Sequence, residues 1–309
     1  MDNLTHSLVG ALIGQAGLKR KTGLAMPALI LGANLPDVDA ACFFWLDGVQ
    51  HLGFRRGITH GPIAWVLLPL LLAGALWWFD RWQARRGTRP EGRLPVRFGW
   101  LYALSFIACL SHPALDWLNS YGVRLLEPFS SRWFYGDVLF IIDLWLWALM
   151  GFATWFSLRR ERRGGEWRRP AQVALVTVVL YAGMNYGITR AIEFAQSEQP
   201  AIASPLPLAF WQREIIEPAG PGRWRIDGRR VGECDLAPAR AEARTDPYLA
   251  AFLFWSRAPF AERSGDGSMI VFDARFYDPR ARDRFSVALP HVRCEPISQA
   301  VRAEETARP

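Results

Sequence analysis

Several features that would place this chain in a familiar class are missing from its sequence. The first residues lack a basic segment and a clear cleavage site, so we expect no removable signal peptide. No internal repeat is visible, and low-complexity sequence is confined to arginine-rich segments. Paired apolar segments interrupted by Gly or Pro, which mark the two halves of many secondary transporters, are also missing. These absences argue against a secreted precursor, a repeat protein and a transporter.

Charge is nearly missing from long stretches of the first 192 residues. Gly61 to Phe79 carries none, and about 20 apolar residues suffice to cross a bilayer. Phe98 to Leu110 is a further apolar run, which we expect to continue toward His112 and to break there. Two more are Val138 to Leu158, with only Asp143 charged, and Ala171 to Ile192, with only Arg190 charged. Leu8 to Leu18 and Gly23 to Leu35 are shorter, and we expect them to cross or re-enter as a pair. The pattern predicts six crossings.

Positive charge gathers between these apolar runs. Residues 1–192 contain 20 Lys and Arg against 12 Asp and Glu, whereas residues 193–309 contain 16 against 17. The basic residues of 19–21, 81–97 and 159–169 share one side of six crossings, and the positive-inside rule makes that side cytoplasmic. We therefore predict a multi-pass membrane protein whose C-terminal part lies outside the cytoplasm. A basic excess confined to the apolar part indicates topology, and we expect no nucleic-acid partner.

Residues 196–309 have a different character. Prolines and balanced charges punctuate them, and β-like runs occupy Arg223 to Ile226, Ser268 to Phe276 and Phe285 to Val292. Asp227-Gly228 and Asp266-Gly267 are turn signals between the candidate strands. The predicted fold is mainly α: a polytopic helical membrane domain over residues 1–195, then a small, mostly β, soluble domain over 196–309.

The four cysteines divide between these two parts. Cys234 and Cys294 both lie in the predicted soluble domain, where an oxidising compartment would allow a disulfide. Cys42 and Cys109 lie in the membrane part, where we expect core or lipid-facing thiols. The alternative is that all four cysteines are reduced.

Polar motifs with three of the five histidines stand beside the apolar runs. In the predicted topology they all lie at the outer ends of their segments. Ionisable groups at membrane depth are costly and usually functional. A divalent cation would hold several carboxylates and imidazoles together by offsetting their repulsion and desolvation. The predicted metal ligands are His6, Asp37, Asp39, His60, His112 and Asp116.

The local spacings suit metal ligation. His112 and Asp116 are four residues apart, so a helix would present both on one face, with Pro113 in its first turn. Asp37 and Asp39 flank one apolar residue, so an extended segment would aim both carboxylates the same way. Mixed imidazole and carboxylate ligands favour zinc, with Mn²⁺ or Fe²⁺ as alternatives. Six ligands leave room for two metals or for supporting carboxylates.

These residues also have interpretations without a metal. A single histidine of this kind is commonly interfacial or hydrogen-bonded. Asp37 follows a proline and would cap a helix. Asp143 suits a structural pairing with Arg124 or Arg132 as well as it suits a place in the site.

The motifs together resemble a known family. Asn-Leu-Thr-His-Ser, Leu-Pro-Asp-Val-Asp, Arg-Gly-Ile-Thr-His and His-Pro-x-x-Asp-x-x-Asn, spread over residues 1–150, are similar to the YdjM family of membrane-bound, metal-dependent hydrolases. That family is grouped with zinc-dependent phospholipase C and phosphoester-cleaving nucleases. The resemblance implies the bacterial inner membrane and assigns the six residues above as ligands or their neighbours. Gly61 departs from the serine expected after His60.

Two functions of different classes follow. In the first, the protein hydrolyses a phosphoester or lipid-linked substrate, which reaches the site laterally through membrane lipid. Asp37 or Asp39 would act as general base or bridging ligand, and Arg56 would offer a two-pronged contact to a phosphate. In the second, the protein is not catalytic and binds a regulatory partner, as described for a LexA-binding member of the family. The sequence names no protein partner.

Overall fold

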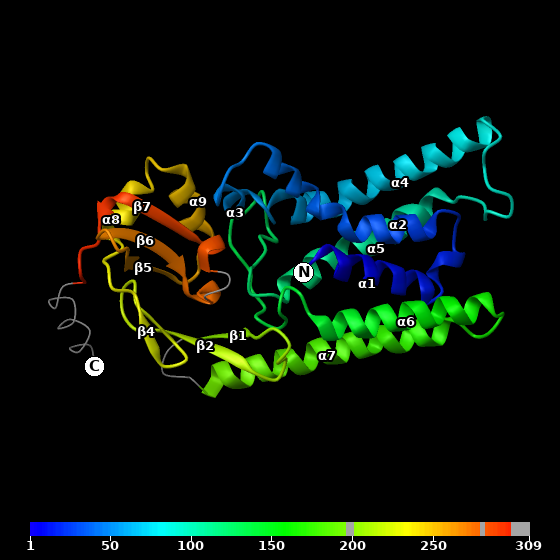
Figure 1. Ribbon diagram of the computed structural model, residues 1–309. Helices are drawn as coiled ribbons and strands as arrows, with labels where there is room; N and C mark the ends of the chain where they lie inside the picture. Colours follow the sequence, from blue (N-terminus) through cyan, green and yellow to red (C-terminus); the bar gives the residue numbers. More distant parts are fainter. Residues whose placement is uncertain (196–200, 279–281, 298–309) are drawn as a thin grey trace. The chain divides into compact units, whose positions relative to one another are not determined.

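The computed structural model describes residues 1–195, 201–278 and 282–297 (Figure 1). They form two compact units, and the chain passes between them more than once. The first, here called the helical unit, contains residues 1–39, 56–188 and 205–211. The second, the C-terminal unit, contains 40–55, 189–204 and the described part of 212–309. The predicted domain boundary at 195/196 borders residues outside the described ranges, so it stays a prediction.

Helices build the first unit. The α-helices are α1 (Asn3–Gln15), α2 (Ala25–Asn34), α4 (Pro62–Arg85), α5 (Phe98–Trp117), α6 (Leu144–Arg162) and α7 (Arg168–Ala195), and the last turns of α7 belong to the second unit. The 3-10 helices η1 (Leu18–Arg20), η2 (Leu35–Phe44) and η3 (Ile58–His60) connect them, and η2 ends in the second unit. Helix α2 packs against both α1 and α5, which positions the polar ends of all three.

Local sequence explains where α1 begins and how closely it packs. The carboxylate of Asp2 accepts the N–H groups of Leu4 and Thr5, which have no partner inside the helix. A Cβ at Gly10 would lie 2.5 Å from the carbonyl oxygen of Leu29 on α2. The missing side chain therefore permits a close approach of the two helices, as small residues do in membrane proteins.

Among the described residues, α4, α5 and α7 are long and apolar enough to cross a membrane. They contain three of the predicted apolar runs, and α6 contains the fourth but begins at Leu144 and not at Val138. Helices α1 and α2 have 13 and 10 residues, fewer than the roughly 20 that a crossing needs. The count of six crossings therefore stays a prediction. Leu71 and Val179 are 68% and 69% exposed, as lipid-facing side chains of α4 and α7 would be.

The basic segments of the helical unit gather at one end of its bundle. The backbone N–H of Gly23, two residues after the basic segment 19–21, donates to the carbonyl of Pro95 at 3.2 Å. Lys19 pairs with Glu161 and lies 4.4 Å from the ring of Trp167. The three basic segments at 19–21, 81–97 and 159–169 thus share one end, as the sequence predicted. The histidines of the polar motifs lie at the other ends of α1, α4 and α5.

Helix α5 corrects one prediction. We expected a break at His112 and a new helix beginning at Pro113, but α5 runs continuously to Trp117 with Pro113 inside it. The proline removes one backbone hydrogen bond, and packing of α5 against α2 and α4 holds the helix together across that gap. His112 and Asp116 still share one helix face, because their spacing is unchanged.

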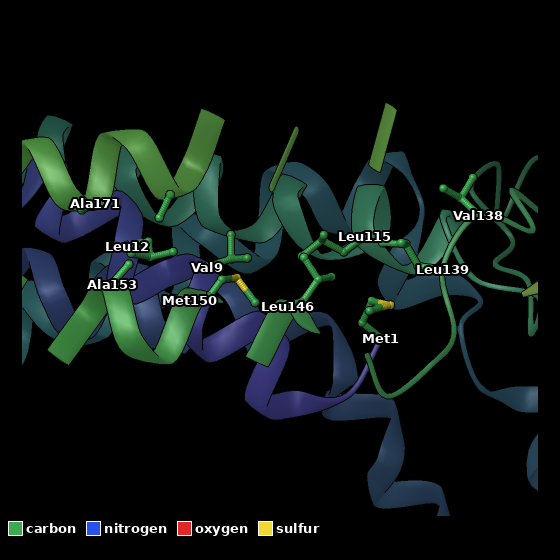
Figure 2. Packing of buried hydrophobic residues seen from close by; sticks show 11 residues of the cluster. Met1, Val9, Leu12, Leu115, Val138, Leu139, Leu146, Met150, Ala153 and Ala171 are labelled. Atoms are coloured by element: carbon green, nitrogen blue, oxygen red, sulfur yellow. The ribbon is translucent and has the colours of Figure 1, made fainter. Parts of the chain in front are cut away.

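The apolar core joins α1, α5, α6 and α7 (Figure 2). Leu12 of α1, Leu146 and Met150 of α6 and Leu139 are 2% exposed or less. Met1 and Leu115 belong to this cluster, and Leu115 is the residue before Asp116 in α5. The core therefore holds the first residues of the chain against the last turns of α5.

Two antiparallel sheets form the C-terminal unit, so the predicted mainly α chain with a β-rich C-terminal part is confirmed. One sheet has the order β1-β2-β3-β4 and the other β5-β6-β7. The strands are β1 (Ile202–Pro205), β2 (Arg213–Pro218), β3 (Trp224–Ile226), β4 (Arg229–Val231), β5 (Pro259–Arg263), β6 (Ser268–Asp273) and β7 (Ser286–Arg293). All three predicted β-like runs contain a strand. Asp227-Gly228 turns β3 into β4, with both residues at positive φ.

Three helices of this unit were not predicted: α3 (Gln50–Phe54), α8 (Ala237–Glu242) and α9 (Pro247–Trp255). Helix α9 carried a signal, because Asp246 caps it and Pro247 occupies its first turn. Helix α3 packs on α9, where a Cβ at Gly53 would lie 3.1 Å from that of Ala251. Residues 40–55 therefore fold with the C-terminal unit although they lie between two polar motifs. A 3-10 helix, η4 (Ala274–Phe276), follows β6, and η5 (Arg282–Phe285) precedes β7.

The structure confirms the predicted disulfide and not the alternative of four reduced cysteines. Cys234 and Cys294 form a disulfide, whereas Cys42 and Cys109 are buried free thiols. The disulfide joins two residues that are 60 apart in the sequence, and β5, β6 and β7 all lie between them. A cross-link of this kind is typical of a compartment outside the cytoplasm.

Thiol counting tests this arrangement. Protein that is purified and unfolded without reductant should expose only the thiols of Cys42 and Cys109. Reduction should then release two more. A Cys234→Ser variant should release the thiol of Cys294 before reduction. Four reactive thiols in unreduced wild type would contradict the disulfide.

Candidate metal centre

Four of the six predicted ligands converge in the helical unit. Asp37 comes from η2, His60 from η3, and His112 and Asp116 from the last turns of α5. One ligand atom from each lies within 4.8 Å of the others. Asp116 is the centre of the group, since its Oδ2 lies 3.4 Å from Nε2 of His60 and 3.5 Å from Nε2 of His112. Asp37 Oδ1 lies 3.7 Å from the same His112 nitrogen.

These separations fit a bound cation. Nitrogen and oxygen ligands lie about 2.0–2.2 Å from zinc, so two of them are at most about 4.4 Å apart. The ligands of a tetrahedral ion are about 3.4 Å apart, which the separations of 3.4, 3.5 and 3.7 Å already match. The widest pair, which lies within 4.8 Å, would close by about an ångström around such an ion. The Nε2 atoms of His60 and His112 and Oδ2 of Asp116 are buried and make no hydrogen bond. Oδ2 of Asp116 has the Arg56 guanidinium as an ion-pair partner, with Nε at 3.1 Å. Buried polar atoms are normally paired, so the two imidazole nitrogens are the atoms that still need a partner.

The backbone orients His112 for ligation. Its Nδ1 lies 2.7 Å from the carbonyl oxygen of Ala33 at the end of α2. A carbonyl only accepts hydrogen bonds, so Nδ1 carries the proton and Nε2 presents its lone pair to Asp37 and Asp116. A ligand histidine characteristically donates its other N–H in this way. The junction of α2 with α5 thus selects the tautomer that a metal requires.

His60 is oriented through a neighbouring hydroxyl. Thr59 Oγ1 lies 3.0 Å from Nδ1 of His60 and 3.2 Å from Oδ2 of Asp39. A hydroxyl has one proton, so the consistent arrangement is donation from His60 to Thr59 and from Thr59 to Asp39. Nε2 of His60 is then the unprotonated nitrogen, directed at Asp116. Burial lowers the pKa of His60, which favours the neutral ring that binds metals.

The two aspartates of Leu-Pro-Asp-Val-Asp take different places, which corrects another prediction. We expected an extended segment that aims both carboxylates the same way, but the segment is the 3-10 helix η2. With three residues per turn, positions two apart point in different directions. Asp37 faces His112, whereas Asp39 accepts the backbone N–H of Arg56 at 2.7 Å. Asp39 therefore supports His60 and its loop from beside the group of four.

His6 lies beside the group and not within it. Its ring stacks on that of His112 at 3.8 Å, and its Nε2 lies 3.4 Å from Oδ1 of Asp116. Neither of its buried ring nitrogens makes a hydrogen bond. The amino group of Met1 also contacts Oδ1 of Asp116. His6 thus lies next to Oδ1 of Asp116, whereas His60 lies next to Oδ2. In that position His6 would serve a second cation, or the same cation after a shift of the ligands.

Arg56 is buried and makes several contacts with the protein. Its Nε lies 3.1 Å from Oδ2 of Asp116, and its Nη1 donates to Oδ1 of Asn119 at 3.2 Å. Its guanidinium also lies 4.5 Å from the ring centre of Tyr121. The predicted contact of Arg56 with a substrate phosphate would have to replace some of these. In this geometry Arg56 neutralises and holds Asp116.

Some residues of the site were missed, and one was mislocated. Thr59 and Asn119 orient His60 and Arg56, and both stand inside the quoted motifs, three residues or fewer from a ligand. Tyr121 carried no comparable signal. Asp143 was expected to pair with an arginine or to join the site, but it caps α6 by accepting the N–H groups of Trp145 and Leu146.

A family model for the YdjM inner membrane protein matches residues 1–192. The chain belongs to the YdjM inner membrane protein family. All six predicted ligands of this YdjM-family protein lie inside the matched segment. The uncharacterized protein YfhP of Bacillus subtilis is 25% identical over 167 residues, which cover 51% of this chain and 47% of YfhP. No solved structure matches the chain significantly.

The structure explains why this YdjM-family chain has glycine after His60. A Cβ at Gly61 would lie 1.9 Å from the carbonyl oxygen of Glu127. The φ angle of Gly61 is −92°, so contact and not backbone strain excludes a side chain. Gly61 is also the residue before α4, where serine would otherwise favour the helix. The close approach of residue 127 therefore outweighs the usual capping preference.

Gly61→Ser should consequently destabilise the protein in spite of its capping side chain. We expect the free energy of unfolding to fall by about 1–3 kcal/mol, because residue 127 or the η3 loop must shift. Gly74→Ser on the same helix is the matched control, since nothing lies within 4 Å of a Cβ there. Denaturant unfolding in detergent would measure both. A Gly61→Ser protein as stable as the control would refute this account.

Proposed function

We propose that this protein is a membrane-bound, metal-dependent hydrolase of a phosphoester or lipid-linked substrate. One observation carries the proposal: the buried Nε2 atoms of His60 and His112 converge on Oδ2 of Asp116, and neither nitrogen makes a hydrogen bond. A purely structural polar cluster would satisfy its own buried atoms. Membership of the YdjM family is consistent with this proposal and does not by itself name a reaction.

Asp37, His60, His112 and Asp116 would hold the cation, and His6 is available for a second. The mixed nitrogen and oxygen donors favour zinc, with manganese and iron as alternatives. When bound, such a cation supplies Lewis acidity, which activates water and polarises an ester oxygen. Arg56 keeps Asp116 ionised and in place, and Thr59 with Asp39 keeps the His60 ring in its binding orientation.

Substrate would approach the group at Asp37. His60, His112 and Asp116 are fully buried, whereas Asp37 is partly exposed. Val38 and Ile58 are each more than half exposed, and they stand one and two residues from Asp37 and His60 in the chain. Exposed apolar residues beside a polar site suit a substrate with a lipid part. Asp37 is accordingly the carboxylate that we assign to proton transfer with the substrate.

In the proposed topology this site lies at the face of the inner membrane that is turned away from the cytoplasm. The basic segments lie at one end of the helical unit, and positive charge favours the cytoplasmic side. The metal-binding residues lie at the other ends of the same helices. The disulfide of the C-terminal unit agrees with a location of that unit outside the cytoplasm.

Metal analysis with a matched pair of variants tests the site. Detergent-purified wild type, supplied with zinc, manganese or iron, should retain about one or two equivalents by elemental analysis. Asp37→Asn should lower retention and reduce hydrolysis of bis-p-nitrophenyl phosphate and of a fluorogenic phospholipid by about 100-fold. Asp47→Asn, an exposed residue outside the group, should change neither. Wild type that binds no metal would instead support the non-catalytic, partner-binding function.

Removal of the Thr59 hydroxyl tests the orientation of His60 separately. Thr59→Val keeps the shape of the side chain and removes the bridge from Nδ1 of His60 to Asp39. We expect metal affinity to fall about 10-fold or more while the fold is retained. Thr177→Val is the control, because that hydroxyl bonds only within α7. Equal metal affinities in the two variants would mean that Thr59 does not position His60.

A further inference from the structure

We propose that a groove between α6 and α7, at the basic end of the helical unit, binds an anionic phospholipid. The groove encloses about 450 Å³. Its long walls are apolar and include Phe152 and Phe156 of α6 and Val173 of α7. Arg160 and Arg169 line its other end. An apolar channel that ends in two cations has the shape and charge of an acyl chain beneath a phosphate headgroup.

Small residues create the hollow. Ala153 of α6 and Ala174 of α7 line the groove, and they are 6% and 2% exposed. They lie beneath larger neighbours that project outward, since Phe152 is 63% and Val173 is 64% exposed. The groove therefore runs between the two helices, with Ala153 and Ala174 at its base. Its lining is apolar and solvent-exposed in the protein alone, which is costly in water and favourable against lipid.

The charge at the basic end is suited to a phosphate group. Residues 159–169 contain six arginines and two glutamates. Arg160 Nε donates to the backbone carbonyl of Glu166 at 2.6 Å, which holds this guanidinium at the groove. The carboxylate of Glu166 also lines the groove, and it accepts the backbone N–H of Arg168 at 2.9 Å. Arg160 and Arg169 thus face the headgroup, while Glu166 caps the start of α7.

The surroundings favour a lipid over a soluble ligand. Val176, Val179 and Leu180 continue the exposed apolar surface of α7 beyond the groove. This surface belongs to a candidate membrane span, so the groove opens toward the bilayer. Basic pockets between membrane helices commonly bind anionic headgroups in this way. The groove lies at the end of the bundle away from the metal centre, and the inference does not depend on hydrolysis.

Lipid titration tests the groove on the full-length, delipidated protein in a mild detergent. Native mass spectrometry would count bound phosphatidylglycerol, with phosphatidylcholine of the same acyl chains as the neutral probe. Wild type should prefer phosphatidylglycerol. Arg160→Gln with Arg169→Gln should weaken that binding about 10- to 30-fold and abolish the preference, given about 1 kcal/mol per basic residue at a lipid surface.

The matched control removes the same charge from the same segment. Arg162→Gln with Arg163→Gln leaves the groove lining intact, and we expect phosphatidylglycerol affinity within about threefold of wild type. Val173→Trp, an exposed position, should fill the groove and weaken both lipids. Equal losses in the two arginine pairs would overturn the proposal in favour of diffuse charge attraction. Undiminished binding in Val173→Trp would also overturn it.

Discussion

The burial of the Asp116 carboxylate is the constraint on which the site depends. This carboxylate has no exposed surface, and a buried charge without partners costs several kcal/mol. Its partners come from three segments. Residues 1–6 provide the Met1 amino group and His6, the segment before α4 provides Arg56 and His60, and α5 provides His112. Each of these segments must therefore be in place before the carboxylate is compensated. The Nε2 atoms of His60 and His112 lie 3.4 and 3.5 Å from one oxygen of Asp116, and neither makes a hydrogen bond.

The helical unit separates its two kinds of polar chemistry along its length. The lysines and most of the arginines gather at one end, where they contact tryptophan rings and pair with Glu161 and Asp80. The histidines and most of the buried aspartates gather at the other end, together with Arg56. Apolar surface on α4 and α7 separates the two ends. The basic end suits contact with anionic lipid, whereas the buried acidic and imidazole end suits a cation, so one bundle would offer two different ligands two separate places.

Asp39 and Arg56 mark where the chain leaves and rejoins the helical unit. Residues 40–55 between them fold with the C-terminal unit, through the packing of α3 on α9. The hydrogen bond from the backbone N–H of Arg56 to the Asp39 carboxylate joins the two residues that flank residues 40–55. Both residues also support the group of Asp37, His60, His112 and Asp116, Asp39 through Thr59 and Arg56 through Asp116. The segment that joins the two units is thus anchored by the residues that hold the ligands in position.

Local sequence predicted the features that depend on short-range chemistry. Long uncharged runs require burial or lipid and appeared as helices, and β-branched runs between turn residues became strands. Helix α5 was predicted to break at His112 because proline disfavours a helix interior, yet tertiary packing holds it intact through Pro113. Leu-Pro-Asp-Val-Asp has no local signal that separates an extended segment from the 3-10 helix observed. Those two errors concern backbone conformations that neighbouring elements decide.

The sequence by itself determined which residue types bear the chemistry, because histidines and aspartates beside apolar runs are too costly to be incidental. It also determined the asymmetry of charge and therefore the expected orientation. Only the tertiary structure decided which of the six residues meet: Asp37, His60, His112 and Asp116 form the group, Asp39 supports it and His6 stacks beside it. The tertiary structure also showed that Arg56, predicted to contact a substrate phosphate, pairs with Asp116. The reason is that ligand distances depend on how α2, η2, η3 and α5 pack, and that packing is set by contacts between residues far apart in the chain.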